Sequence, residues 1–374
     1  MSWKPQRLDQ LGQVSRGKSK HRPRDALHLY GGPYPFVQTG DVKHAGLYIT
    51  EHQQTYSEEG LKQSKLWPAG TMCITIAANI GDTAILKYDA CFPDSVIGFI
   101  ADPEKADARF VKYSFQATLQ KQFKQFTQGS AQDNLSQEKL LSLELSVPSV
   151  SEQQRIADIL SSYDDLIETN RRRMALLEES ARHLYQEWFV RLRFPGHEHT
   201  RAVEGVPDGW VLTPLGQRIA LNYGKTLKAD DRISGPFPVY GSGGIIGTHE
   251  KALIQGPGII VGRKGSVGTV FWCGKDFYPI DTVFFVDSTE SSIYLYYALK
   301  HMYFTSTDVA VPGLNRDFAY SRQLLWPSDK ILVAFLEYVA PVFGQIEKLA
   351  EINQKLQTAR DQLLPRLMIG EIAV

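Results

Sequence analysis

The chain has 374 residues, 43% of them hydrophobic and 22% charged, and its 41 Lys and Arg residues balance 41 Asp and Glu residues. This length gives room for roughly two or three domains with ample core-forming residues. A formal net charge of zero argues mildly against a protein that coats nucleic acid regardless of sequence, but it is compatible with local basic patches. Cys73, Cys91 and Cys273 have the spacing of neither a zinc site nor a disulfide framework. Without a signal-like leader or an apolar run of membrane-spanning length, we expect a soluble cytoplasmic protein with no membrane partner.

A basic loop lies near the start of the chain. Seven Lys or Arg residues occur between Lys4 and Arg24, against the single acidic residue Asp9. The run from Arg16 to Lys20 is too small and polar for a strand or a helix, so it is expected to be a loop. Contact with phosphate groups is a reasonable use of such a loop, and a solvated surface loop is an equally good interpretation.

Short strands are predicted between Tyr34 and Val147, where Gly, Pro and Asn punctuate apolar runs. We expect strands at residues 71–77, 84–86 and 95–100, a turn at 79–82 and a helix at 109–126. A polar loop from Gln128 to Asn134 follows, and its side chains are of the kinds that pair with base edges. An ordinary helix-to-strand loop has a similar composition, so both interpretations stand.

The segment from Ser151 to Phe189 is predicted to be one long helix. Ser151 and Gln154 form a capping box, and Pro148 ends the preceding strand. Seam-type residues recur at alternating steps of four and three, which is the heptad pattern of a coiled coil. These positions are Ile156, Leu160, Tyr163, Ile167, Asn170, Met174, Leu177, Ala181, Leu184 and Trp188.

After a linker at residues 194–199, the chain repeats itself. Anchors are 207 residues apart at Trp3 and Trp210 and at Gly17 and Gly224, 187 apart at Gly81 and Gly268, and 179 apart at Pro148 and Pro327. An ordered series of anchors with a shrinking offset indicates a duplication followed by loop changes, which leave the second arm 28 residues shorter. The two arms are therefore expected to have the same kind of function, each with a different target.

Two glycine-rich segments of the second arm, residues 240–244 and 262–268, are interpreted as hairpin turns. The second resembles a phosphate-binding loop, but a predicted strand follows it where that motif requires a helix. The first lacks the flanking strand and helix of a dinucleotide site. We expect the glycines to be structural, and Arg263 and Lys264 to be presented at a hairpin tip for contact with nucleic acid.

A second seam follows from adding 179 to each position of the first. It comprises Phe335, Val339, Val342, Ile346, Leu349, Asn353, Leu356, Arg360, Leu363 and Leu367. The antiparallel alignment that faces Asn170 with Asn353 also faces Ile156 with Leu367 and Trp188 with Phe335, and a buried Asn pair fixes coiled-coil register. The alternative is two amphipathic helices on separate cores, but a globular helix seldom keeps a seam so long. Pro341 is expected to kink or interrupt the second helix.

Catalytic motifs are missing from the sequence. There is no Pro-Pro pair, and therefore no loop of the adenine methyltransferase kind. The acidic-x-Lys triplet that a nuclease would place one strand after Pro93 and Asp94 is missing as well. No Ser, His and Asp arrangement or His cluster stands out, so an enzyme acting on its own is disfavoured.

Over nearly its whole length the chain resembles the specificity subunit of type I restriction-modification systems. The resemblance is carried by the Pro-Ser helix start at residues 148–156, the helix end at 184–189, the arm openings at Trp3 and Trp210, and the turn at 262–268. Its strength lies in the architecture, because each motif alone is weak. The second copy, at residues 327–330, lacks the Glu-Gln-Gln run of the first, so contacts made by that run would be one-sided.

The resemblance implies an α+β fold with a pseudo-twofold internal repeat. Two globular mixed α/β target-recognition domains, at residues 1–150 and 197–328, would be separated and joined by two long antiparallel coiled-coil helices, at 151–196 and 329–374. Each domain would read half of a split site in double-stranded DNA. A helix of about 33 residues would be about 50 Å long, or about 15 base pairs, and would act as a spacer.

The resemblance also implies partners and a division of labour. Two DNA methyltransferase subunits would dock on the helices, and restriction subunits would complete the complex. S-adenosylmethionine, ATP and magnesium would be used by those partners, so this chain would bind no cofactor or metal and carry no catalytic residue. Its role would be DNA sequence specificity.

The expected DNA contacts fall into two sets. Basic residues would hold phosphates and set register: Lys18, Lys20, Arg22, Lys225 and Lys228. Polar loop residues would read base edges: Gln128, Ser130, Gln132 and Asn134 on the first arm, and Ser242, Arg263, Lys264, Asn315 and Arg316 on the second. The rival interpretation is a two-armed adaptor that binds proteins, which the neutral net charge suits and the basic loops disfavour.

Overall fold

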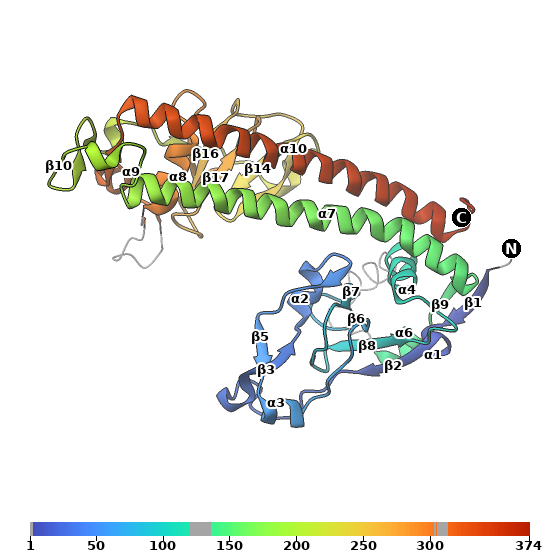
Figure 1. Ribbon diagram of the computed structural model, residues 1–374. Helices are drawn as coiled ribbons and strands as arrows, with labels where there is room; N and C mark the ends of the chain where they lie inside the picture. The colour runs from blue at the N-terminus through green and yellow to red at the C-terminus, as the bar shows by residue number, and fades with distance from the viewer. Residues whose placement is uncertain (1–2, 120–135, 303, 305–312) are drawn as a thin grey trace. The chain divides into compact units, whose positions relative to one another are not determined.

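A computed structural model describes residues 3–119, 136–302, 304 and 313–374 (Figure 1). The chain divides into two compact units: unit 1 comprises Met1–Arg171 and Glu351–Val374, and unit 2 comprises Arg172–Ala350. The long helices α7 (Val150–Tyr185) and α10 (Asp329–Met368) each contribute to both units, because the unit boundaries fall inside them. No helix in the described ranges is both long enough and apolar enough to cross a membrane.

Unit 1 is organised around a mixed sheet with strand order β2-β8-β6-β7-β4. Its strands are β2 (Gly12–Arg16), β8 (Val96–Ala101), β6 (Met72–Thr75), β7 (Thr83–Leu86) and β4 (Tyr48–Ile49). Smaller antiparallel pairs are formed by β1 (Lys4–Arg7) with β9 (Glu144–Val147) and by β3 (Tyr30–Phe36) with β5 (Gln54–Tyr56). The strands predicted at 71–77, 84–86 and 95–100 are confirmed, and β6 and β7 form the expected hairpin.

Unit 1 also contains short helices. They are α1 (Leu8–Leu11), η1 (Leu27–Leu29), α2 (Thr39–His44), α3 (Glu58–Lys62), α4 (Ala108–Ser114), the π-helical η2 (Phe115–Leu119) and α6 (Gln137–Leu141). The helix predicted at 109–126 is therefore confirmed as far as Leu119, and its remainder lies outside the described residues. Phe110 and Tyr113 of α4 are buried in one core cluster with Leu160 of α7 and Leu367 of α10.

Unit 2 contains a sheet with strand order β13-β19-β16-β17 and another with order β15-β14-β18. The first has β13 (Asn222–Tyr223), β19 (Val283–Val286), β16 (Gly258–Gly262) and β17 (Val270–Cys273); the second has β15 (Gly244–His249), β14 (Phe237–Gly241) and β18 (Tyr278–Pro279). Further pairs are β12 (Val211–Pro214) with β20 (Gln323–Trp326) and β10 (Ala202–Val203) with β11 (Val206–Pro207).

The helices of unit 2 pack around an aromatic core. They are η3 (Gln186–Val190), η4 (His197–His199), η5 (Leu215–Gln217), η6 (Ala229–Asp231), α8 (Ile293–His301) and α9 (Arg316–Ser321), together with segments of α7 and α10. Tyr185 and Phe189 contact Tyr294 of α8 at ring-centroid distances of 6.0 and 4.8 Å. Burial of such rings dominates the energetics of a core.

The internal repeat is reproduced in the strand pairings. Lys4 pairs with Val147 as Val211 pairs with Trp326, Arg16 with Ile97 as Tyr223 with Phe284, and Thr75 with Val96 as Gly262 with Val283. These pairs show the offsets of 207, 187 and 179 that the sequence anchors gave. The predicted duplication is therefore confirmed at the level of individual backbone partners.

The predicted head-to-tail pairing of the long helices is confirmed within each unit (Figure 1). In unit 1 the Asn170 amide donates to the Asn353 side-chain oxygen at 2.8 Å, and Asn353 donates to the Ile167 carbonyl at 3.1 Å. In unit 2 the rings of Trp188 and Phe335 lie 5.9 Å apart. All remaining predicted seam residues are buried or half-buried: Ile156, Leu160, Tyr163, Met174, Leu177, Ala181, Leu184, Val339, Val342, Ile346, Leu349, Leu356, Arg360, Leu363 and Leu367.

Of the kink or interruption expected at Pro341, the interruption is wrong, because α10 continues through this residue. A proline inside a helix removes one backbone hydrogen bond and costs about 3 kcal/mol. Val339 and Phe343, on either side of Pro341, are both buried in the core of unit 2. This packing outweighs the local cost and keeps the helix continuous.

Candidate nucleic-acid interface

The basic loop of unit 1 starts at a glycine held against the sheet. The Gly17 amide donates to the Val96 carbonyl at 2.9 Å, and the Lys18 amide donates to the Phe92 carbonyl at 3.1 Å. A Cβ atom at Gly17 would lie 2.4 Å from the carbonyl oxygens of Phe92 and Pro93. Glycine is required here because no side chain fits between the loop and these carbonyls.

Unit 2 has an equivalent glycine, which is held against its sheet in the same way. The Gly224 amide donates to the Val283 carbonyl at 3.3 Å, and the Lys225 amide donates to the Pro279 carbonyl at 3.0 Å. A Cβ atom at Gly224 would lie 2.1 Å from the Ile280 carbonyl oxygen. The repeated Gly-Lys sequence therefore marks the position at which each unit attaches a basic loop to its sheet.

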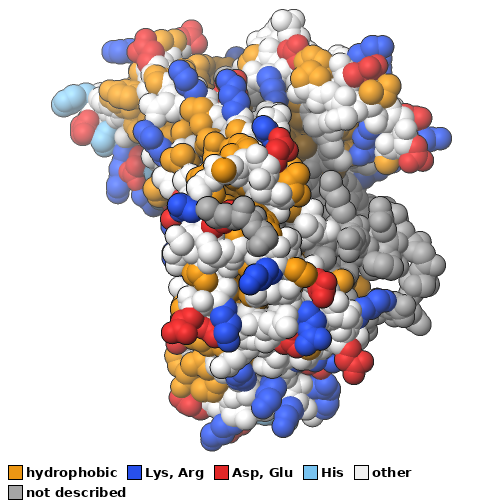
Figure 2. All heavy atoms as spheres, turned by 90° about the vertical axis from the view of Figure 1, so that its right-hand side faces the viewer, with side chains coloured by type: hydrophobic (Ala, Val, Ile, Leu, Met, Phe, Trp, Pro, Cys, Tyr) orange, Lys and Arg blue, Asp and Glu red, His pale blue; other side chains and the backbone are white. Residues whose placement is uncertain are grey.

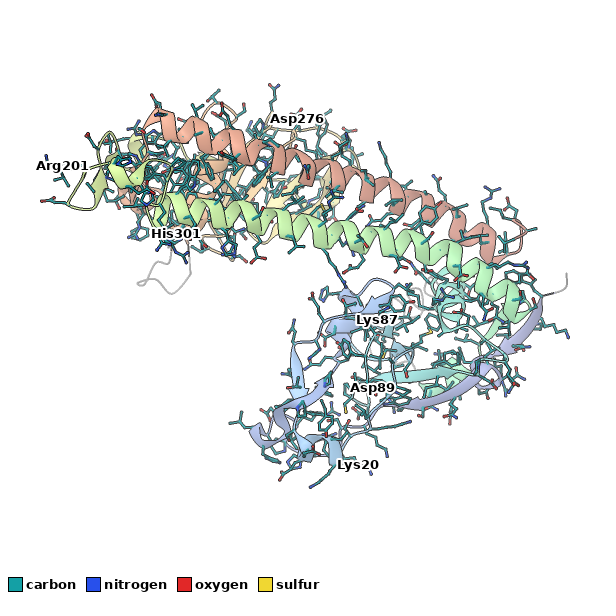
Figure 3. The ribbon with its side chains drawn as sticks, in the orientation of Figure 1. Lys20, Lys87, Asp89, Arg201, Asp276 and His301 are labelled. Carbon is teal, nitrogen blue, oxygen red and sulfur yellow. The ribbon has the colours of Figure 1, made fainter. Side chains whose placement is uncertain are left out.

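Beyond Gly17, the loop exposes the ammonium groups of Lys18 and Lys20. Figure 3 shows Lys20 at the end of unit 1 away from α7. Arg22 is also exposed, but its guanidinium donates to the carbonyls of Ser19 and His21 at 2.7 Å each. Lys18 and Lys20 are thus available to phosphates, whereas Arg22 also helps to hold the loop. In unit 2 the corresponding side chains of Lys225 and Lys228 are exposed.

Three loops of unit 2 converge beside Gly224. The β14–β15 and β16–β17 connections are the predicted hairpin turns, and the Thr269 hydroxyl links them by donating to the Ser242 carbonyl at 2.5 Å. The segment before α9 is joined to the second turn, because the Leu314 amide donates to the Arg263 carbonyl at 2.8 Å. Through these contacts, segments as far apart in the sequence as Ser242 and Leu314, 72 positions, are linked.

An exposed tyrosine lies at the centre of this convergence. The Arg263 guanidinium lies 5.2 Å from the ring centroid of Tyr223, and the Arg316 guanidinium lies 5.1 Å from the same centroid. Tyr223 remains 50% exposed and Arg316 is also exposed. The patch formed by Tyr223, Arg263, Lys264 and Arg316 is called the Tyr223 patch below. None of its cations pairs with a carboxylate of the described residues.

Arg263 lies in the β16–β17 turn, as predicted, but its side chain turns inward. Arg263 is half-buried, and its Nη2 atom donates to the Asp281 carbonyl at 2.9 Å. Its guanidinium also lies 5.7 Å from the Phe284 ring, so stacking on neighbouring strands draws the side chain inward. Lys264 alone of the pair is exposed.

The remaining predicted base-reading residues differ in their contacts and burial, and some lie outside the described residues. The Asn315 side-chain oxygen caps α9, accepting from the amides of Asp317 and Phe318 at 2.8 and 3.1 Å. Ser242 is half-buried in the β14–β15 turn. Gln128, Ser130, Gln132 and Asn134 lie outside the described residues.

Sequence reasoning missed Tyr223. The sequence feature that could have identified it is an aromatic residue directly before the repeated Gly-Lys pair, at a strand position that faces solvent. The position equivalent to it in unit 1 is Arg16, because both pair with equivalent residues of the next strand. The duplication alone therefore pointed to this position as one at which the arms differ.

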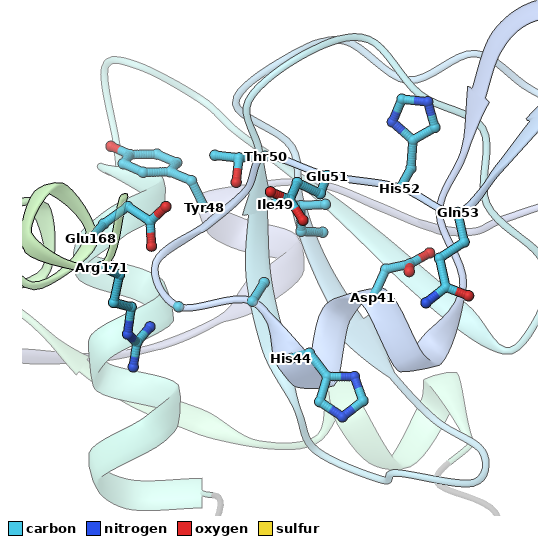
Figure 4. Close-up of a pocket in the computed structure, with 12 residues that line it drawn as sticks. Asp41, His44, Tyr48, Ile49, Thr50, Glu51, His52, Gln53, Glu168 and Arg171 are labelled. Atoms are coloured by element: carbon cyan, nitrogen blue, oxygen red, sulfur yellow. The ribbon is translucent and has the colours of Figure 1, made fainter. Parts of the chain in front are cut away.

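Unit 1 has a pocket lined largely by a segment that is much shorter in unit 2 (Figure 4). Residues 37–53 connect β3 to β5 and include α2 and β4, whereas only residues 242–243 connect β14 to β15, the equivalent strands of unit 2. Asp41, His44 and Glu51 of this longer connection, with Glu168 and Arg171 of α7, line a pocket of about 290 Å³. Among the described residues, no group of three or more His, Cys, Asp or Glu side chains could hold a metal ion.

A buried ionic cluster joins α4 to both long helices in unit 1. Arg360 forms an ion pair with Asp164, and the Tyr113 hydroxyl donates to the same carboxylate. Burial raises the pKa of Tyr113, and it lowers the pKa of the neighbouring Lys112 ammonium to about 8. Arg360, which occupies a seam position, is therefore accommodated by a carboxylate on the facing helix.

Charges of both signs are interspersed on the face shown in Figure 2. This distribution agrees with the formal net charge of zero. Attraction of a polyanion would then depend on local groups such as the two Gly-Lys loops and the Tyr223 patch.

Known proteins share this architecture. The family model described as type I restriction modification DNA specificity domain matches residues 1–179 and 207–316. The specificity subunit of type I restriction enzyme MjaIX from Methanocaldococcus jannaschii is 24% identical over 409 residues, covering 100% of this chain and 94% of that protein. The specificity subunit of type I restriction enzyme HindI from Haemophilus influenzae is 24% identical over 321 residues, covering 62% of this chain and 69% of that protein.

A solved structure has the same fold. The crystal structure of a type I restriction-modification system S subunit from M. genitalium matches with a TM-score of 0.59 at 19% sequence identity. The match covers 98% of this chain and 96% of that one. Two globular arms and long helices are thus the arrangement of a known fold.

Proposed function

This chain belongs to the type I restriction-modification DNA specificity family, and from that premise we propose that it reads a split DNA site and supplies no chemistry of its own. Unit 1 would read one half of the site and unit 2 the other. The catalytic work would fall to partners, namely DNA methyltransferase subunits that bind S-adenosylmethionine and restriction subunits that use ATP and magnesium. Such a complex would act in the cytoplasm.

The observation that carries this proposal is a common backbone frame with different side chains. Gly17 and Gly224 make equivalent hydrogen bonds to their sheets, and each is followed by an exposed lysine. Beside this shared feature, unit 2 has Tyr223 where unit 1 has Arg16. Two domains that recognise different DNA sequences need the same backbone contacts to phosphates, because these contacts set the register. They need different exposed side chains, because contacts with bases set the sequence preference.

The long helices support the spacer part of the proposal. Helix α7 has 36 residues, which corresponds to about 54 Å at 1.5 Å per residue. This length is comparable to about 16 base pairs of duplex. We propose that α7 and α10 hold the two arms at a fixed separation and offer their outer faces to two methyltransferase subunits, so that the gap between half-sites is constant.

Selection from a random duplex pool tests the proposal. The chain would be co-purified with the methyltransferase subunit encoded beside it, and the bound duplexes would be sequenced. We expect two short conserved blocks separated by an invariant gap. Enrichment of nothing by an intact complex would contradict the proposal and would favour an adaptor whose arms bind proteins.

A matched pair of variants tests the phosphate role of the Gly-Lys loops. Lys18→Ala and Lys225→Ala should weaken binding to all sequences alike and should each reduce the slope of log affinity against log salt concentration by about 1. The sequence preference of both blocks should stay unchanged. A change of preference at a single base position would assign the lysine to base reading instead.

A further inference from the structure

We infer that Arg316, stacked on Tyr223, reads a guanine in the half-site of unit 2. The inference rests on the proposed function and names the base that the Tyr223 patch recognises. Arg316 combines an exposed guanidinium with a fixed aromatic platform, since it lies 5.1 Å from the Tyr223 centroid and 5.9 Å from the Tyr320 centroid. A planar guanidinium donates in pairs, and the O6 and N7 atoms of guanine form the matching acceptor pair in the major groove.

The backbone around Arg316 is fixed from two sides. Asn315 caps α9 with two hydrogen bonds, and the Leu314 amide donates to the Arg263 carbonyl at 2.8 Å. The Arg263 amide in turn donates to the Thr282 carbonyl at 2.9 Å, which ties this segment to the sheet. A side chain that is positioned before binding loses less conformational entropy on contact with DNA, and this raises the affinity of the contact.

Arg263 serves as a positioning residue for the platform. Its guanidinium is retained by the Asp281 carbonyl and lies close to both Tyr223 and Phe284, so it steadies the tyrosine ring from within the unit. Two guanidinium groups near one ring, with exposed Lys264 beside them, also leave a local excess of positive charge. Acceptor atoms such as those of guanine satisfy this arrangement, whereas the amino group of cytosine does not.

Unit 1 has no arginine stacked on an aromatic ring at the equivalent positions. Its residues equivalent to Tyr223 and Arg263 are Arg16 and Ile76, and the position equivalent to Arg316 is Gln137, which follows the cap residue of α6. No aromatic platform is available at these positions. The inference therefore predicts an effect in one block of the site only.

The test compares variants in the same selection, using the full chain with its methyltransferase partner. Arg316→Ala should lower the preference for guanine at one position of one block by about 10-fold or more. Arg316→Gln should shift that position toward adenine, since Gln pairs with the N6 and N7 atoms of adenine. The matched control, Gln137→Ala in unit 1, should leave this guanine preference intact.

Variants of Tyr223 separate positioning from folding. Tyr223→Phe keeps the ring and should retain the guanine preference, whereas Tyr223→Leu should lose several-fold of it at the same position. The double variant Tyr223→Leu/Arg316→Ala should lose no more than Arg316→Ala alone, because the tyrosine acts through the arginine. Equal effects of the Phe and Leu variants would contradict the platform role.

Each outcome distinguishes the inference from the function on which it rests. If the unaltered protein enriches two blocks and Arg316→Ala leaves both unchanged, the inference is overturned and DNA reading stands. Uniform weakening of all sequences by Arg316→Ala, with a smaller salt dependence, would make Arg316 a phosphate contact and would also overturn the inference. If the unaltered protein enriches nothing, the proposed function itself fails.

Discussion

Replacing Arg360 by Leu should destabilise unit 1 far more than a typical change on a helix surface. Arg360 pairs with Asp164, whose side chain is only 8% exposed, while the Arg360 side chain is 20% exposed. Without the guanidinium, the Asp164 carboxylate keeps the Tyr113 hydroxyl as its hydrogen-bond donor. Breaking a buried ion pair by removing one partner costs about 3–5 kcal/mol, so we expect a loss of about 3 kcal/mol in the free energy of unfolding.

The control is Arg366→Leu on the same helix. Arg366 pairs with Glu371 at 2.8 Å, but both side chains are at least 50% exposed, so its loss should be about 0–1 kcal/mol. The double variant Arg360→Leu/Asp164→Asn should recover most of the stability, because Asn removes the unpaired buried charge and still offers an oxygen to the Tyr113 hydroxyl.

Urea-induced unfolding followed by circular dichroism measures these free energies, and hydrogen exchange of peptides from α7 and α10 assigns the loss to unit 1. If Arg360→Leu falls within about 1 kcal/mol of Arg366→Leu, or if the double variant is less stable than Arg360→Leu alone, the buried-pair reasoning is wrong.

Three further predictions concern unit 1. Gly17→Ala should lower the melting temperature by several degrees, because its Cβ atom would lie 2.4 Å from two carbonyl oxygens, whereas Gly40→Ala, with nothing within 4 Å, should not. Burial lowers the pKa of Lys112 from its ordinary value to about 8, so between pH 8 and 10 the unfolded chain binds more protons than the folded chain does. Stability should therefore rise by about 2 kcal/mol from pH 8 to 10 relative to Lys112→Met, and parallel pH profiles of the two proteins in urea titrations would contradict this. Asn170→Leu should cost about 1–2 kcal/mol, because it leaves the buried Asn353 oxygen without its donor. Adding Asn353→Leu should restore stability in the same titrations, and a further loss would contradict this explanation.

The features that sequence predicted well are those with a local period or an internal copy. The steps of four and three between seam residues identified both helices, and the shared layer of Asn170 and Asn353 set their alignment, which the hydrogen bond between them confirms. The offsets of the duplication recur in the strand pairs of the two arms, because a copied chain keeps its backbone partners. The turn at residues 262–268 was recognisable as a hairpin because strands flank it on both sides.

The features that sequence missed depend on contacts between distant segments. Whether Arg263 projects into solvent or lies inward is decided by Tyr223 and Phe284, which no local pattern connects to it. The effect of Pro341 was overestimated, because the local rule omits the packing of its neighbours. The sequence showed a difference of 28 residues between the arms, but only the strand pairings show that part of it lies in the segment that contains α2 and β4.

The division of α10 between the units has a consequence for synthesis on the ribosome. Unit 2 is a single stretch, Arg172–Ala350, whereas unit 1 needs Glu351–Val374, whose Leu364 and Leu367 are buried in its core. At about 5–20 residues per second, the ribosome takes roughly 10–40 seconds to make unit 2. For that time the nascent first unit exposes the apolar surface that α10 later covers, and it depends on chaperones or on partial packing. The order in which the units are completed is therefore the reverse of the order in which they are encoded.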